Sequence, residues 1–292
     1  MNRPSLRSLF GSDDIVLAPG GGGPLDLLMV ERAGYKAAYL SGYSVAAQRY
    51  GLPDIGLIAF REMSEVVNAV CRVTSLPIIV DCDTGYGGVL NVRQTVREFE
   101  DAGAAAVMIE DQSWPKRCGH MQNKTIEPIE IAVAKIEAAV KARRNDDLVI
   151  MARTDACDVL GFEEALRRCK AFKAVGADMV CMHSPRSIED LKILAAEIEG
   201  PHVVSIGEGE FTDAIDVSEL FRIGFQFASL PSGILRTAAF AVTAMLERVR
   251  ERRHARDIAG SAIDLGTLNE LVGLAALSDF EDSIGQRPGR AS

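Results

Sequence analysis

The sequence predicts an α/β fold, a (β/α)8 TIM-type barrel with a C-terminal helical extension. Short apolar runs without in/out alternation recur along the 292 residues, a longer segment of helical period follows most of them, and glycine repeatedly marks the return to the next run. Unbroken apolar runs are typical of parallel strands covered on both faces. About eight such units in a chain of this length favour a closed barrel over an open doubly wound sheet.

The individual elements follow from the same pattern. Segment 61–74 is expected to be a helix because Met63, Val66 and Val70 lie on one stripe. The same period predicts helices at 92–102, 131–143 and 163–175. Glycine is the usual left-handed cap where a helix ends, and it stands at positions 34, 103, 176 and 224. Strands are expected at 15–18, 37–40, 77–81, 106–109, 148–152, 179–182, 202–205 and 225–230.

A closed barrel does not require the end of this chain. Segments 237–250 and 261–284 have helical period, and the tail 285–292 is expected to be disordered. We therefore expect a barrel over residues 1–255 and an extension over 256–292. The extension either packs on a neighbouring subunit or folds back on its own barrel.

Composition and charge limit the possible partners. The chain is 48% hydrophobic and 25% charged, as soluble globular proteins are, and its net charge is −9. This charge gives no electrostatic reason to bind nucleic acid or an anionic membrane. The N-terminus lacks the apolar core of a signal peptide and no apolar run is long enough to span a bilayer, so a cytoplasmic enzyme is expected. An anionic substrate must be bound by local cations or by a metal.

Acidic residues gather at the predicted carboxyl ends of the strands, where barrel enzymes carry their chemistry. Asp81 ends the third strand, Asp83 stands two residues beyond it, and Glu110 follows the fourth strand. Oxygen ligands of this kind suit Mg2+ or Mn2+, and a cation would relieve their mutual repulsion. The alternative is that the two aspartates only cap the following helix.

Two further strand ends carry candidate substrate ligands. Arg153 is placed to bind a carboxylate or phosphonate, or else it forms an internal salt bridge to Asp155 or Glu110. His183 either binds an anionic group or hydrogen-bonds a neighbouring loop. The glycines at 20–23 do not match a nucleotide-binding motif and indicate a close-approach turn.

The pentapeptide 116–120, Lys-Arg-Cys-Gly-His, suggests a reactive cysteine. Cys118 lies among cations and next to a histidine, which would lower its pKa and make it partly thiolate. The other five cysteines stand mostly in apolar runs, so neither a disulfide framework nor a zinc site is expected. The alternative is a polar surface loop with an incidental cysteine.

Together these motifs resemble the isocitrate lyase and phosphoenolpyruvate mutase superfamily. The resemblance rests on segments 38–42, 51–54, 81–87, 109–112, 116–120 and 152–156. The pentapeptide is similar to the signature of the carbon–carbon lyase branch, typified by methylisocitrate lyase and dimethylmalate lyase. The resemblance implies a barrel, a Mg2+ ion, a homotetramer with an exchanged terminal helix, and a gating loop that carries the cysteine.

The resemblance also implies roles for individual residues. Asp83 would bind the metal most directly, with Asp81 and Glu110 acting through water and with Asp54 nearby. Cys118 would protonate an enolate carbon, and Tyr39 would help deprotonate a hydroxyl. The remaining catalytic residues of the loop would be Lys116 and His120, and the substrate's carboxylates would be held by Ser41, Gly42 and Arg153.

Two departures from the lyase pattern concern the half of the substrate that leaves as the enolate. His183 and Ser184 stand where these lyases generally carry glutamate, and Ser205 stands where they carry asparagine. Both His183 and Ser205 are expected to contact a small anionic carboxylate substrate. We therefore predict a Mg2+-dependent lyase that cleaves a 2-hydroxy di- or tricarboxylate. The alternatives are a phosphorus–carbon bond enzyme, an oxaloacetate hydrolase or decarboxylase, and a non-catalytic dicarboxylate-binding barrel.

Overall fold

The computed structural model describes residues 3–207, 209, 211–254 and 262–284. The chain divides into two compact units, Met1–Leu235 and Arg236–Ser292. The boundary expected between residues 255 and 256, and the tail expected to be disordered at 285–292, lie outside the described residues.

The first unit is an eight-stranded parallel barrel, as the sequence predicts. The strand order is β6-β5-β4-β3-β2-β1-β8-β7, and a parallel bridge between Val180 and His202 joins the two ends of the sheet. The strands are β1 Val16–Gly21, β2 Ala38–Leu40, β3 Ile78–Asp81, β4 Ala106–Glu110, β5 Val149–Thr154, β6 Met179–Met182, β7 Val203–Ser205 and β8 Phe227–Leu230. Each expected strand is present, shifted by a few residues at most.

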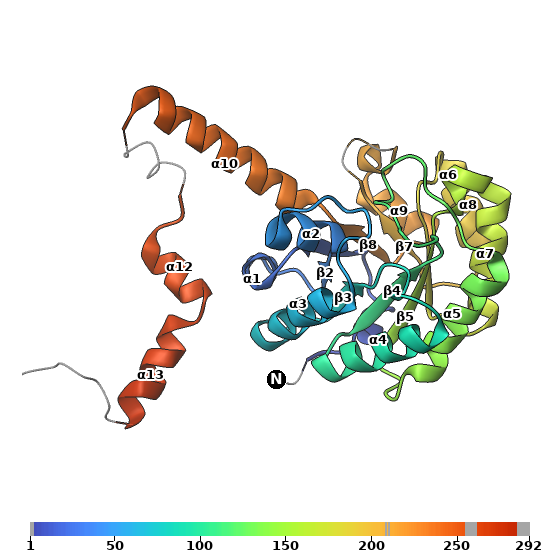
Figure 1. The fold of residues 1–292 in the computed structure, drawn as a ribbon, viewed down its shortest axis with the longest axis horizontal. Helices are drawn as coiled ribbons and strands as arrows, with labels where there is room; N and C mark the ends of the chain where they lie inside the picture. The colour runs from blue at the N-terminus through green and yellow to red at the C-terminus, as the bar shows by residue number, and fades with distance from the viewer. Residues whose placement is uncertain (1–2, 208, 210, 255–261, 285–292) are drawn as a thin grey trace, which may run out of the picture. The chain divides into compact units, whose positions relative to one another are not determined.

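Helices surround the strands on the outside (Figure 1). They are α1 Pro24–Arg32, α2 Gly42–Tyr50, α3 Phe60–Val73, α4 Val89–Ala102, α5 Ile129–Ala142, α6 Ala156–Leu160, α7 Phe162–Ala174, α8 Ile188–Glu197 and α9 Val217–Ile223. The four helices expected in this unit are confirmed. Gly103 and Gly224 adopt left-handed conformations that end α4 and α9. Glycine suits both positions because a side chain would be strained in this conformation.

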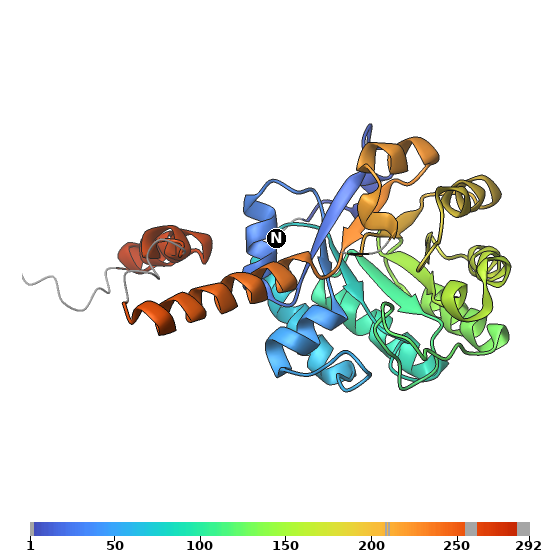
Figure 2. The ribbon, with the colours of Figure 1, turned by 90° about the horizontal axis from the view of Figure 1, so that it is seen from above.

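Alternate residues along each strand contribute to two separate apolar layers. In β4, Ala106 and Met108 belong to the cluster inside the barrel, whereas Val107 and Ile109 pack toward the helices. This explains why the strands are apolar throughout. The short 3-10 helix Leu6–Leu9 adds Leu6 to the inner cluster, so side chains fill the barrel and the polar site lies beyond the carboxyl ends of the strands. Figure 2 shows the curvature of the strands from above.

The second unit is helical over its described residues. It contains most of α10 Gly233–Arg252, followed by α12 Leu265–Leu271 and α13 Leu274–Ile284. None of the described residues of these three helices is buried, although their apolar residues include Phe240, Leu277 and Phe280. Within the described part of the chain, no helix has the length and apolarity that a membrane crossing requires.

Candidate active site

The carboxyl ends of the strands enclose a small polar cavity. Its lining residues are Tyr39, Ser41, Tyr43, Asp54, Asp81, Glu110, Lys116, Arg117, Cys118, Gly119, His120, Arg153, His183, Ser205, Pro231 and Ser232. Every predicted site residue except Gly42 and Asp83 is in this set. The cavity holds about 30 Å³ of free space, room for one or two waters.

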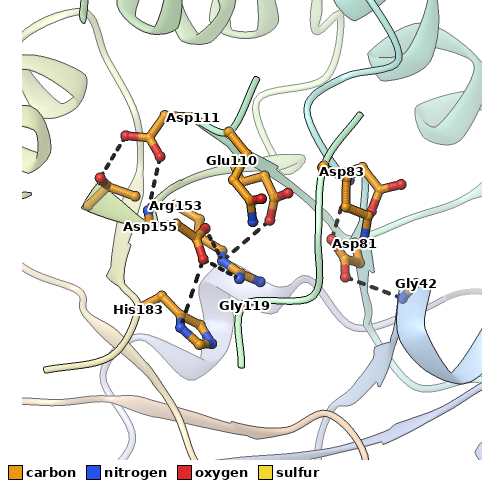
Figure 3. Close-up of polar contacts among 12 residues, drawn as sticks. Gly42, Asp81, Asp83, Glu110, Asp111, Gly119, Arg153, Asp155 and His183 are labelled. Carbon is orange, nitrogen blue, oxygen red and sulfur yellow. Dashed lines mark hydrogen bonds and ion pairs between the residues drawn. The ribbon is translucent and has the colours of Figure 1, made fainter. Parts of the chain in front are cut away.

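Gly42 and Asp83 lie directly behind the cavity wall, where they meet Asp81 (Figure 3). The Gly42 amide donates to Asp81 Oδ2 at 3.2 Å, and the Asp83 amide donates to Asp81 Oδ1 at 3.3 Å. A Cβ at position 42 would lie 3.2 Å from Asp81 Oδ2 and 3.2 Å from Asp83 Oδ1. The first turn of α2 approaches the carboxylates this closely because residue 42 has no side chain.

The three acids predicted as metal ligands are buried. Burial raises the pKa of Asp83 to about 7 although Lys116 opposes the shift, and burial likewise raises the pKa of Glu110 well above its ordinary value. Glu110 Oε1 has no hydrogen-bond partner among the described residues. Lys116 pairs with Asp83, but the unpartnered Glu110 oxygen leaves the cluster incompletely satisfied without an added cation.

Among the described residues, no group of three or more acids, histidines or cysteines is placed to hold a metal ion by itself. Mg2+ does not require one, because it keeps several waters and usually takes one or two protein carboxylates. Glu110, whose Oε1 has no partner among the described residues, forms with Asp81 and Asp83 a set of oxygen donors that fits a hydrated Mg2+ or Mn2+ ion.

Arg153 has the internal ion pair that the sequence left open, and it also lines the cavity. Its Nε and Nη2 donate to the two carboxylate oxygens of Asp155 at 2.9 and 2.8 Å. Glu110 Oε2 lies 3.5 Å from Nε, since Glu110 and Arg153 are paired residues of adjacent strands. Burial alone would raise the pKa of Asp155, but the charge and the hydrogen bonds of Arg153, helped by nearby Lys124, outweigh it and lower that pKa.

A buried hydrogen-bond network centred on Asp111 holds Asp155 in place. Asp111 accepts hydrogen bonds from Thr154 Oγ1 at 2.6 Å and from the Asp155 amide at 2.9 Å. Arg168 Nη1, on α7, donates to the same Asp111 carboxylate at 3.0 Å. The second acid of the pair at 110–111 therefore supports the site from the helix side and does not face the cavity.

His183 is buried and its Nδ1 lies 2.8 Å from Ser184 Oγ. Burial lowers the pKa of His183 well below its ordinary value, and neighbouring Arg153 lowers it further. The imidazole is therefore neutral and can meet a substrate oxygen only through a hydrogen bond. Its ring also packs edge-on against His120, with 5.0 Å between the ring centres.

The pentapeptide lies on an excursion between β4 and α5, residues 112–126, which we call the Cys118 loop. Its two arms pair through an antiparallel bridge between Gln112 and Ile126. The Gln112 side chain exchanges two hydrogen bonds with the backbone of Arg117, and the Cys118 amide donates to Asp54 O at 2.9 Å. Lys116 Nζ lies 2.5 Å from Asp54 Oδ1 and 2.7 Å from Asp83 Oδ1.

The prediction that Cys118 is partly thiolate is wrong. Burial raises the pKa of Cys118, and this effect exceeds the opposing influence of the backbone hydrogen bond at His120 and of the charges on Arg153 and Lys116. The sequence showed the cations but not the burial. The thiol therefore keeps its proton, as a general acid must.

The role that the resemblance implies for Tyr39 also needs correction. Burial raises the pKa of Tyr39 well above its ordinary value, and the nearby Asp81 adds to this shift. A phenol that holds its proton so firmly is not a base at neutral pH. Tyr39 can instead donate a hydrogen bond into the cavity that it lines.

A family model described as phosphoenolpyruvate phosphomutase matches residues 24–250. This chain belongs to the phosphoenolpyruvate mutase and isocitrate lyase superfamily. It is 35% identical over 276 residues to a 2,3-dimethylmalate lyase of Eubacterium barkeri, with 94% of this chain and 96% of the relative covered. It is 38% identical over 283 residues to a 2-methylisocitrate lyase of Aeropyrum pernix, with 96% and 90% covered.

Among solved structures of the superfamily, a phosphonopyruvate hydrolase in complex with oxalate and Mg2+ superimposes with a TM-score of 0.86. The two chains are 26% identical, and the match covers 97% of this chain and 98% of the hydrolase. The resemblance inferred from the sequence motifs is confirmed, as is the prediction of an enzyme of this superfamily.

Sequence reasoning missed some residues that shape this superfamily site. Tyr43 and Arg117 line the cavity, Gln112 holds the backbone of the Cys118 loop, and Lys124 is a buried residue of its returning arm. Gln112 follows the Glu-Asp pair of a recognised motif, which was the available signal. Nothing in the sequence distinguishes Lys124 from a solvent-exposed lysine.

Proposed function

We propose that this chain is a Mg2+-dependent carbon–carbon bond lyase that cleaves a 2-hydroxy di- or tricarboxylate into an α-keto acid and a carboxylate. The observation that carries the proposal is the protonated Cys118 thiol at a cavity lined by Arg153, Asp81 and Glu110. A cleavage that releases a carboxylate-stabilised enolate needs such an acid to quench the carbanion.

The acids at the ends of β3 and β4 would hold the metal. We assign direct binding to Asp83 and contacts through water to Asp81 and Glu110, whose Oε1 has no partner among the described residues. When bound, the divalent cation supplies charge stabilisation to the hydroxyl and carboxylate oxygens of the substrate.

The substrate's carboxylates would be held by donors on the other side of the cavity. Arg153 supplies a fixed guanidinium because Asp155 holds it in place. Ser41 Oγ accepts a hydrogen bond from the Ser44 amide at 3.3 Å, which leaves the hydroxyl proton of Ser41 for a substrate oxygen. His183 and Ser205 would contact the departing half, with His183 acting as a neutral hydrogen-bonding group.

Retro-aldol cleavage then needs two proton movements. The hydroxyl proton passes to the carboxylate cluster, where we assign Glu110 as the acceptor, and Tyr39 donates a hydrogen bond to the substrate oxygen. The electrons of the broken carbon–carbon bond form the enolate, and Cys118 Sγ gives its proton to the enolate carbon. Lys116 and Arg153 favour the resulting thiolate. After product release the thiolate regains a proton from water, and Glu110 releases to water the proton that it accepted.

A panel assay with the purified protein and Mg2+ tests this function. The substrates are 2-hydroxy di- and tricarboxylates, oxaloacetate and phosphonopyruvate, and the products followed are keto acid and phosphate. We expect keto acid from a hydroxy acid, lost with EDTA and in Cys118→Ala, while Cys157→Ala, at a buried cysteine outside the cavity lining, keeps the activity. Absence of turnover across the hydroxy acids would refute the proposal.

One observation favours a second candidate, a phosphorus–carbon bond enzyme. The neutral His183 with Ser184 occupies the wall where the lyase pattern would place a carboxylate. An uncharged wall accepts a dianionic phosphonate with less repulsion than a carboxylate would. Phosphate release from phosphonopyruvate alone would establish this candidate in place of the lyase.

We also infer a homotetramer in which the second unit packs on a neighbouring barrel. Phe240, Leu277 and Phe280 are between 66 and 77% exposed. Large apolar side chains that stay exposed on several helices of one unit are typical of a protein interface.

A further inference from the structure

Lys124 stands on the returning arm of the Cys118 loop, and only 2% of its side chain is exposed. Its Nζ donates to the carbonyl oxygen of Gly119, next to Cys118. On the other side it pairs with Asp158 Oδ2 of α6 at 2.9 Å and lies 3.7 Å from Asp155 Oδ1. One lysine thus joins the loop to the element that follows β5.

Gly119 is where the Cys118 loop meets the substrate-binding wall (Figure 3). A Cβ built on Gly119 would lie 2.3 Å from Arg153 Nη2 and 2.6 Å from His183 Cε1. The backbone at this position therefore rests directly on both side chains. Fixing the Gly119 carbonyl also fixes the neighbouring Cys118 thiol over the cavity.

The returning arm of the loop has free space beside it. Residues 120–124 border a second cavity of about 450 Å³, which Asp158 and Val159 close from α6. Close packing does not hold this part of the loop in place, so its position depends on individual polar contacts. A buried ammonium that loses its partners carries a large desolvation cost, which makes the Lys124 contacts strong ones.

The cavity under the loop is too small for a dicarboxylate, so the loop must open to admit one. We propose that Lys124 is the latch of this movement, a positioning residue that holds the Cys118 loop closed through Gly119 and Asp158. Its effect on turnover rests on the proposed lyase function, whereas its effect on the exposure of Cys118 does not.

The alkylation rate of Cys118 by iodoacetamide measures the latch without any substrate. Cys118 is half-buried whereas the other five cysteines are buried, so it is the thiol that reacts in the folded protein. We expect Lys124→Met to accelerate alkylation by about tenfold or more, the equilibrium shift that loss of one charged hydrogen bond produces. Removal of a cation disfavours the thiolate, so faster reaction must come from exposure.

Lys173→Met is the matched control. Lys173 Nζ donates to the Asp178 carbonyl at 3.0 Å, again five residues away in the sequence, but at the opposite end of the barrel strands. We expect this variant to react at the wild-type rate. Equal acceleration in Lys173→Met would indicate general loosening of the fold and would overturn the latch.

Asp158→Asn keeps the experiment decisive if Lys124→Met does not fold. The Asp158 side chain is 40% exposed, and Lys124 keeps its contacts with Asp155 and the Gly119 carbonyl, so the variant leaves no buried charge without a partner. We expect about threefold faster alkylation, in line with a partly exposed ion pair. Wild-type rates in Asp158→Asn and in any folded Lys124→Met would refute the proposal.

Turnover separates the latch from the lyase function. With an active hydroxy acid, Lys124→Met should lower kcat and leave KM nearly unchanged, because the misplaced group is the acid and not the carboxylate-binding wall. Faster alkylation in a protein that cleaves no hydroxy acid would retain the latch and refute the lyase. A wild-type alkylation rate in Lys124→Met, in a protein that does cleave a hydroxy acid, would refute the latch and retain the lyase function.

Discussion

Cys118 is placed so that its own environment opposes ionisation. Because burial raises its pKa, the thiol is the predominant form at neutral pH and remains so into the alkaline range. If the thiol is the acid, kcat should hold near neutrality and fall only at a pH above the ordinary pKa of a cysteine thiol. Cys118→Ser should lower kcat by about a hundredfold or more and remove this alkaline limb.

A pH–rate profile of both proteins under saturating substrate checks this prediction. An increase of kcat with pH would mean that the thiolate is the active form. In that case the proton of the product would have another source, and the assignment of Cys118 would be wrong.

Arg153 shows what the sequence can establish about a single residue and what it cannot. The sequence offered a substrate ligand or an internal ion pair as alternatives, and the structure gives Arg153 both an ion pair with Asp155 and a place in the cavity wall. Position along a strand predicts which residues meet at the rim. The residues that contact Asp155 in turn, such as Asp111 and Lys124, come from segments far apart in the sequence or from a loop, and no local pattern predicts these contacts.

Helix α2 contributes to the site at its first residue and to stability just after its last. Gly42→Ala should weaken metal binding, because a Cβ there meets Asp81 Oδ2 and Asp83 Oδ1 at 3.2 Å and pushes these carboxylates apart. Gly51 ends the same helix in a left-handed conformation with open space around it. Gly51→Ala should therefore cost about 1 kcal/mol of unfolding free energy and leave metal binding intact.

Calorimetric titration with Mn2+ and chemical denaturation of both variants separate the two effects. Unchanged Mn2+ affinity in Gly42→Ala would exclude Asp81 and Asp83 from the proposed metal site.

Strands and long helices were predictable as elements because burial on both faces and amphipathic period leave a clear sequence pattern. Helix α6, five residues from Ala156 to Leu160, is too short to show a period and was missed. It nevertheless carries Asp158, the partner of Lys124. The Cys118 loop was recognised by its motif, but its closed position depends on Gln112, Asp54 and Lys124, which a linear pattern does not bring together.

On the scale of the whole molecule, the proposed tetramer should depend on the apolar residues of the second unit. Burying Leu277 and Phe280 in an interface contributes about 1.5–3 kcal/mol for each side chain. We therefore expect the double variant Leu277→Ser/Phe280→Ser to dissociate, with its mass measured by sedimentation equilibrium. Leu90→Ser is the control, because Leu90 on α4 is 77% exposed but belongs to the barrel unit.

The wild-type mass distinguishes the two arrangements that the sequence left open for this unit. If the helices fold back on their own barrel, the wild-type protein sediments as a monomer and the double variant loses stability without a change of mass. If they pack on a neighbour, mass falls in the double variant and not in Leu90→Ser. An unchanged tetramer in the double variant would place the subunit interface elsewhere on the barrel.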